Sequence, residues 1–136
     1  ILTVSQIENM RTDVIARSSQ EACGLLAGIR QGESVIVQEL YRMVNVLRSP
    51  VRYRLDPQQQ IDIFFSVEQH GLEVVGFYHS HPEGPNHPSG ADLCEANDPQ
   101  AVYLIWYPQS DGWKCQGFTI QGNTSFPVEL MISQDE

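Results

Sequence analysis

The stretch G-F-Y-H-S-H-P-E-G-P-N-H-P-S-G-A-D, residues 76–92, decides how this sequence is interpreted. The apolar run at residues 74–78 predicts a buried strand that leads directly into His79. Because side chains alternate along a strand, we expect His79 and His81 to point to the same side and Ser80 to point away. Two imidazoles spaced about 6–7 Å apart at Cβ can converge on one metal ion.

A third ligand is available shortly after the histidines. A loop rich in Pro and Gly covers residues 82–88, and Ser89 then begins a predicted short helix that runs to residue 96. Ser89 and Asp92 are three residues apart and share one face of that helix, so Asp92 can complete the ligand set. Catalytic zinc takes three such protein ligands and keeps one position open. His87, inside the loop, is an alternative ligand, although its flanking prolines favour a surface role.

Each part of this pattern also has a purely structural explanation. The S-x-x-D motif is close to a helix capping box, and a histidine pair on a strand more often has a packing or hydrogen-bonding role. The combination favours a metal site, because two histidines at a strand end are followed by a rigid loop and then by a hydroxyl and a carboxylate on one helical face. Two His and one Asp suit zinc, but they also suit iron or manganese.

The remaining elements predict an α/β fold. A capping signal at Ser5 and Glu8 predicts a first helix over about residues 5–18. Asp56-Pro57 predicts the start of a second helix, and residues 42–55 are expected to form an extended edge or a loop. Strands are expected at residues 22–29, 34–41, 74–78, 101–107, 113–120 and 126–131. We therefore expect one domain, residues 1–136, with helices layered around a curved sheet.

Composition and charge exclude several classes of partner. The net charge of −9, from 8 basic and 17 acidic side chains, disfavours nucleic acid, and the arginines of residues 42–54 are most simply a solvated surface. No apolar run approaches the roughly 20 residues that span a bilayer, and no secretory signal is recognisable. Cys23, Cys94 and Cys115 lack paired spacing, so we expect reduced thiols and a cytoplasmic location, although one disulfide with a leftover thiol stays open.

Two separated motifs resemble the JAMM (MPN+) zinc metallopeptidases. H-S-H-P, six residues and then S-G-A-D match the signature H-x-H-P-x6-S-x-x-D, and E-A-C-G-L-L-A-G, which begins at Glu21, resembles the early strand of that family. The resemblance implies a single MPN/JAMM domain with a curved mixed sheet flanked by helices, similar to cytidine deaminases. It also implies that His79, His81 and Asp92 bind zinc, that Glu21 is the general base, and that Ser89 stabilises the oxyanion. On its own, Glu21 is an ordinary carboxylate at a strand edge.

The short connection between Asp92 and residue 101 leaves no room for a large insertion, so the chain is similar to the compact prokaryotic members of this family. These resemble enzymes that cleave after the C-terminal Gly-Gly tail of small ubiquitin-like sulfur-carrier proteins, and such a protein is the expected substrate partner. An extended tail suits β-strand addition to a sheet edge, and the arginines of residues 42–54 are a hypothesis for part of that edge.

Several alternatives stay open at this stage. A cell-wall or phage-tail peptidase shares the motif, and a non-catalytic MPN scaffold would share the fold. A DNA-repair-associated branch is disfavoured by the E-A-C-G-L-L element and by the acidic charge. A zinc deaminase lacks its P-C-x-x-C ligand pair here. A cysteine hydrolase would need Cys23 or Cys94, and Cys23 is predicted to be a buried packing residue because it lies in an apolar run.

Overall fold

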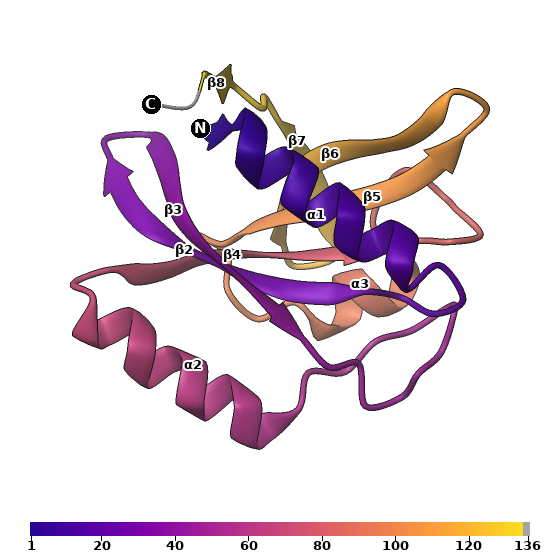
Figure 1. The fold of residues 1–136 in the computed structure, drawn as a ribbon, viewed down its shortest axis with the longest axis horizontal. Coiled ribbons are helices and arrows are strands. Elements are labelled where there is room, and N and C mark those ends of the chain that lie inside the picture. Colours follow the sequence, from indigo (N-terminus) through magenta and orange to yellow (C-terminus); the bar gives the residue numbers. More distant parts are fainter. Residues whose placement is uncertain (135–136) are drawn as a thin grey trace.

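A mixed sheet forms the centre of the computed structural model, which describes residues 1–134. Within that range six strands pair in the order β3-β2-β4-β5-β6-β7, with β4 and β5 parallel and the other neighbours antiparallel (Figure 1). The strands are β2 (Cys23–Gln31), β3 (Ser34–Met43), β4 (Glu73–Ser80), β5 (Val102–Gln109), β6 (Gly112–Gln121) and β7 (Thr124–Val128). The parallel β4–β5 pair lies in the middle of this sheet, with His79 at the carboxyl end of β4 and His81 immediately after it.

Helices cover both faces of the sheet. They are α1 (Val4–Ala16), α2 (Pro57–Gln69) and α3 (Gly90–Glu95). Met10 and Val14 of α1 pack on one face in a buried cluster that includes Trp106. Ile63 of α2 packs on the other face in a cluster that includes Leu25, and Figure 1 shows α3 on that same side. The predicted mixed sheet with flanking helices is therefore confirmed. Within residues 1–134 the helices are too short or too polar to cross a membrane.

The predicted capping box at Ser5 and Glu8 is wrong. The N-cap of α1 is Thr3, whose Oγ1 accepts a hydrogen bond from the Gln6 N–H at 3.1 Å, while Gln6 Oε1 accepts from the Thr3 N–H at 2.9 Å. Two overlapping sequences fit the capping pattern, and a long-range contact selects the first, because Gln6 Nε2 also donates to the Val37 carbonyl of β3 at 2.9 Å.

Other helix and strand boundaries can also be compared with those expected from the sequence. The strand expected to end at residue 78 continues through Ser80, because neighbouring strands pair with it on both sides there. Asp56 caps α2 as predicted, accepting from the backbone N–H groups of residues 58 and 59. The sequence did not predict the short parallel pair of β1 (Leu2–Thr3) and β8 (Ile132–Ser133), which is too brief to leave a periodic pattern.

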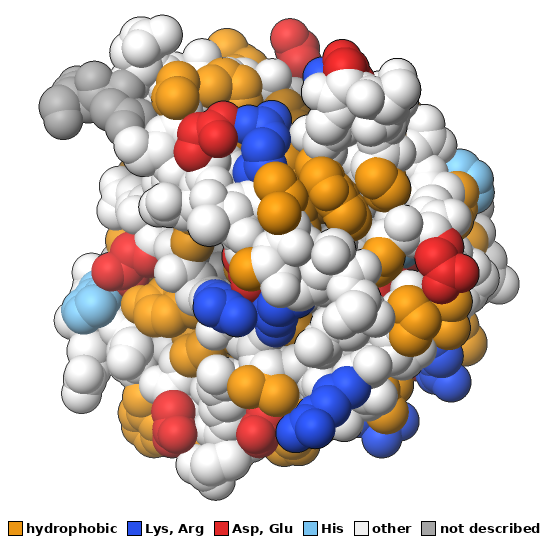
Figure 2. All heavy atoms as spheres, turned by 45° about the vertical axis from the view of Figure 1, so that its right-hand side comes forward, with side chains coloured by type: hydrophobic (Ala, Val, Ile, Leu, Met, Phe, Trp, Pro, Cys, Tyr) orange, Lys and Arg blue, Asp and Glu red, His pale blue; other side chains and the backbone are white. Residues whose placement is uncertain are grey.

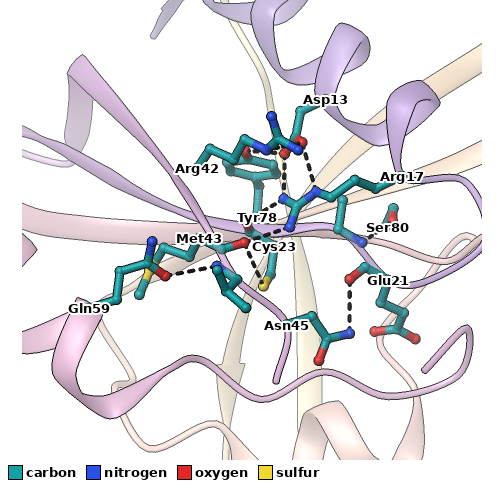
Figure 3. A network of polar contacts seen from close by, with 12 residues as sticks. Asp13, Arg17, Glu21, Cys23, Arg42, Met43, Asn45, Gln59, Tyr78 and Ser80 are labelled. Atoms are coloured by element: carbon teal, nitrogen blue, oxygen red, sulfur yellow. Dashed lines mark hydrogen bonds and ion pairs between the residues drawn. The ribbon is translucent and has the colours of Figure 1, made fainter. Parts of the chain in front are cut away.

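A buried ion pair joins α1 to three strands of the sheet (Figure 3). Both carboxylate oxygens of Asp13 accept from the Arg17 guanidinium, at 2.8 and 2.7 Å. The Tyr78 hydroxyl of β4 donates to Asp13 at 2.7 Å, and Arg42 of β3 lies 2.9 Å from it. Arg17 donates onward to the Cys23 carbonyl of β2 at 3.0 Å. The network therefore fixes the position of α1 relative to β2, β3 and β4, and β4 leads into the site.

Removing the Asp13 carboxylate should destabilise the fold strongly. The side chains of Asp13 and Arg17 are 6% and 11% exposed, so Asp13→Ala leaves a buried guanidinium without its counter-ion. We expect a loss of about 3–5 kcal/mol in the free energy of unfolding, measured by urea denaturation. The control is Glu8→Ala, which breaks an exposed pair with Arg11 on the same helix and should cost about 0–1 kcal/mol. Equal losses in the two variants would contradict a structural role for the buried pair.

Candidate metal centre

His79 and His81 meet at the end of β4. Their Nε2 atoms are 3.1 Å apart, and the two side chains are 1% and 2% exposed. Ser80 points to the other side, where its Oγ accepts from the Ala22 N–H at 2.8 Å and its N–H donates to the Ala22 carbonyl at 3.0 Å. This confirms the expected alternation, and the Ser80–Ala22 contacts hold the histidine pair in register with the segment that precedes β2.

The helix α3 brings Asp92 to the same point. Asp92 Oδ2 lies 3.1 Å from His79 Nε2 and 3.0 Å from His81 Nε2. The same oxygen accepts from the Ser89 N–H at 2.9 Å, and Ser89 Oγ accepts from the Asp92 N–H at 3.1 Å. The two explanations of S-x-x-D are therefore compatible, because one carboxylate completes a capping box and faces both imidazoles.

The hydrogen bonds of His81 decide which of its nitrogens can bind a cation. Its Nδ1 lies 2.8 Å from the Pro85 carbonyl. Because a carbonyl can only accept, Nδ1 is the donor, and the Nε2 of a neutral His81 then carries a lone pair. That lone pair faces the Asp92 carboxylate, so two acceptors are held against each other in a buried site. A proton on Nε2 or a metal ion at their meeting point removes this conflict, and the donor set of two imidazoles and one carboxylate fits zinc.

The pKa directions agree with such a donor set. Burial lowers the pKa of His79, which favours the neutral imidazole. Burial alone would raise the pKa of Asp92, but hydrogen bonds with His79 and His81 outweigh it and lower this pKa, so the carboxylate is ionised at neutral pH. Burial would lower the pKa of His81, whereas its contacts with Asp92 and the Pro85 carbonyl raise it. Metal binding would compete with protonation at His81.

Glu21 lies just ahead of β2 and points into the same site. Its side chain belongs with His79, His81 and Asp92 to a group of ligand atoms that all lie within 4.8 Å of one another. Glu21 is 3% exposed, and its Oε1 has no hydrogen-bond partner among residues 1–134. Burial raises the pKa of Glu21 to about 8, with Asp92 adding to the effect and His81 opposing it. A carboxyl group poised near neutral pH suits proton transfer.

The structure also places the residues that compete with this assignment. His87 is exposed, its Nδ1 lies 3.1 Å from the Pro88 carbonyl, and it is not part of the four-residue group. Cys23 is fully buried as predicted, and burial raises its pKa to about 12, which argues against a thiolate nucleophile. All three cysteines are free.

Tyr53 contributes to the site, and the sequence analysis did not identify it. Its ring stacks on the His79 ring with the centroids 4.6 Å apart and an angle of 26° between the planes. Tyr53 is half-buried, and burial, followed by the charge of Asp92, raises its pKa. No local sequence pattern predicts this contact. Tyr53 lies in the irregular stretch between β3 and α2, and it contacts His79 only in the folded chain.

Comparison with known proteins yields a family and close structural similarity. The profile described as prokaryotic homologues of the JAB domain matches residues 3–116. A protein named desampylase from Haloferax volcanii is 42% identical over 89 residues, which is 65% of this chain and 63% of the relative. A protein named probable TtuB-protein conjugate cleaving protease, from Thermus thermophilus, is 36% identical over 91 residues, 66% of this chain and 58% of the relative. The matches thus span less than two thirds of either relative.

A solved structure extends the similarity over almost the whole chain. The solution structure of a protein from Desulfitobacterium hafniense superposes with a TM-score of 0.89 at 31% sequence identity. The alignment covers 98% of this chain and 92% of the other. The fold described above is therefore also the fold of a protein whose structure was solved experimentally.

Substitution of one imidazole should abolish metal binding. His81→Ala leaves only His79 and Asp92, so we expect zinc affinity to fall by more than about 100-fold, beyond the 10–100-fold loss that outer-shell changes cause. Isothermal titration of the metal-stripped protein with zinc measures this. His87→Ala is the matched control and should bind zinc like the unsubstituted protein. Weakened binding in His87→Ala with normal binding in His81→Ala would show that the wrong histidine had been assigned.

Proposed function

The chain belongs to the family of prokaryotic homologues of the JAB domain, and from this premise we propose that it is a zinc-dependent peptidase or isopeptidase. The substrate is an amide bond that follows the C-terminal Gly-Gly tail of a ubiquitin-like or sulfur-carrier protein. One observation carries the proposal: the Nε2 atoms of His79 and His81 and the Oδ2 of Asp92 lie 3.0–3.1 Å from one another beside the buried Glu21 carboxyl group. A binding module would have no need of that carboxyl group.

In the proposed site His79, His81 and Asp92 hold zinc through the three atoms that already converge. When bound there, zinc supplies Lewis acidity toward the substrate carbonyl and acidifies water. Tyr53 stacks on the His79 ring and excludes solvent from that side. The short α3 and the Pro85 carbonyl fix the Asp92 and His81 side chains, so the ligands need little rearrangement to bind.

Glu21 is the proposed general base. It accepts a proton from the water that attacks the amide carbon and returns it to the leaving amine, so that amide and water become a carboxylic acid and an amine, which ionise at neutral pH to a carboxylate and an ammonium group. The pKa of about 8 in the absence of metal would fall when a cation binds nearby, which leaves Glu21 ionised and able to accept the proton. Because Oε1 has no other partner among the described residues, the carboxyl group has a free oxygen for water.

Ser89 is the proposed donor to the oxyanion that forms on the substrate carbonyl. Its Oγ accepts from the Asp92 N–H at 3.1 Å, and its own hydroxyl proton is therefore available to a further acceptor. One such donor typically contributes about 2.7–4 kcal/mol to the transition state. The same side chain would thus fix the start of α3 and donate to the oxyanion.

The names of the relatives support a protein conjugate as substrate, since one of them is called a conjugate cleaving protease. Two exposed arginines are available to an acidic group of a partner. In the stretch that begins at Arg42 of the edge strand β3, Arg42 pairs with Asp13 and Arg52 pairs with Glu95, whereas Arg48 and Arg54 form no ion pair within residues 1–134. Figure 2, in which the right-hand side of Figure 1 is turned forward, shows a face where Lys and Arg side chains are interspersed with Asp, Glu and hydrophobic ones. We propose that the body of the substrate protein docks here.

Replacement of the base should separate metal binding from catalysis. Glu21→Gln keeps the three ligands, so the protein should bind zinc normally while kcat falls by at least about 100-fold, the lower range for a positioned general base. The assay follows cleavage of a ubiquitin-like protein fused through its Gly-Gly end to a reporter. Turnover near that of the unsubstituted enzyme would refute the role of Glu21. A zinc-loaded, folded wild-type protein that cleaves no such fusion would instead favour a non-catalytic MPN scaffold.

A further inference from the structure

The backbone around Glu21 is held by a segment far from it in sequence. Glu21 precedes β2 and has no partner in the strand ladder. Its N–H donates to the Ser49 carbonyl at 2.7 Å, and its carbonyl accepts from the Asn45 side chain at 3.0 Å. Since Oε1 has no partner among residues 1–134, the position of the carboxyl group is set through the backbone, by these two contacts and by the hydrogen bonds of the next residue, Ala22, to Ser80.

Asn45 uses the full hydrogen-bonding capacity of its amide. The side chain is 1% exposed, and it makes four hydrogen bonds of 3.0–3.1 Å: Nδ2 to the carbonyls of Glu21 and Arg52, and Oδ1 from the N–H groups of Leu47 and Arg54. Two N–H donors and two carbonyl acceptors leave only one orientation of the amide that satisfies all four partners. In Figure 3 a dashed line joins Asn45 to the backbone oxygen of Glu21, whose carboxylate points away from the Asp13–Arg17 pair.

The same amide fixes the aromatic cover of the metal site. Arg52 and Arg54, which Asn45 binds through a carbonyl and an N–H, flank Tyr53 on both sides. The Tyr53 ring stacks on His79. The two arms of the segment also meet through the backbone, where the Val46 N–H donates to the Arg54 carbonyl at 3.0 Å, but Val46, Leu47 and Val51 are 39–59% exposed and contribute little burial. Asn45 is thus the side chain that joins Glu21 to both neighbours of Tyr53.

We propose that Asn45 is a positioning residue for catalysis, which holds Glu21 and Tyr53 at fixed places relative to the histidine pair. The inference rests on the proposed function, since it takes Glu21 as the base and His79 as a metal ligand. Displacement of a catalytic group by about 1 Å can cost on the order of 100-fold in rate. A segment that slides against β2 would move Glu21 and leave the three metal ligands, which are held by β4 and α3, in place.

Gln59 offers a matched control. Its Oε1 accepts from the Val44 N–H at 2.8 Å, one residue before Asn45, so it also holds this segment in place. No hydrogen bond of Gln59 reaches Glu21, Arg52 or Arg54 among the described residues. Gln59→Ala therefore loosens the segment at its start and spares the contacts that define the proposal.

The first test compares Asn45→Ala with Gln59→Ala on the cleavage of a Gly-Gly fusion, well below the melting temperature of each variant. We expect kcat of Asn45→Ala to fall at least tenfold, with KM and bound zinc per chain within twofold of the unsubstituted enzyme. Gln59→Ala should keep kcat within twofold. An Asn45→Ala enzyme with unchanged kcat, or an equal loss of kcat in both variants, would overturn the proposal.

A second test does not depend on activity and separates this proposal from the proposed function. Amide hydrogen exchange by NMR, on protein with and without zinc, should show faster exchange at Glu21 and Arg54 in Asn45→Ala than in Gln59→Ala.

If Asn45→Ala does not fold, Asn45→Asp can replace it in this test, because the aspartate keeps both hydrogen bonds that Asn45 accepts and loses the two that Asn45 donates. Exchange at Glu21 should then rise while Arg54 stays protected. Unchanged protection at Glu21 would overturn the proposal even if the enzyme is active, and a wild-type protein without activity would overturn only the function.

Discussion

The arrangement of this site depends on one electrostatic constraint. Two imidazole nitrogens and a carboxylate oxygen lie 3.0–3.1 Å from one another where water is largely excluded. His81 has its proton-bearing nitrogen on the Pro85 carbonyl, so its other nitrogen presents a lone pair to Asp92. Acceptors held this close in a buried site repel one another unless a proton or a metal ion lies between them. β4 and α3 therefore hold the three ligand atoms in an arrangement that suits a bound cation, which all three atoms can contact.

The sheet and the helices supply that arrangement from opposite sides. β4 pairs with both β2 and β5 at its carboxyl end, which fixes the direction of the histidine pair. The capping box at the start of α3 fixes the carboxylate of Asp92. On the other face, the Asp13–Arg17 pair ties α1 to the Cys23 carbonyl of β2, two residues beyond Glu21. β2 and β4 thus contribute both to the stability of the fold and to the geometry of the site.

The sequence allowed good prediction of whatever depends on local periodicity and short spacing. The alternation of β4, the helix start at Asp56, and the meeting of Asp92 with the histidines all follow from such patterns. Glu21 was identified only through a family resemblance, since nothing local marks a carboxylate ahead of an apolar run as buried. Two competing capping patterns near the N-terminus were resolved by a contact between Gln6 and β3, which no local signal contains. Asn45 was missed for the same reason, because its partners are spread over more than thirty residues of chain.

The most direct test of the metal centre is the metal content of the wild-type protein, purified without a tag and without added metal, by native mass spectrometry. We expect about one zinc ion per chain, as a site with three protein ligands requires. The ion should leave when the protein is unfolded or treated with a strong chelator, and return when zinc is added back. A folded protein that carries no metal and takes up none from added zinc would contradict the account, and the chain would then be a binding module built on the same fold.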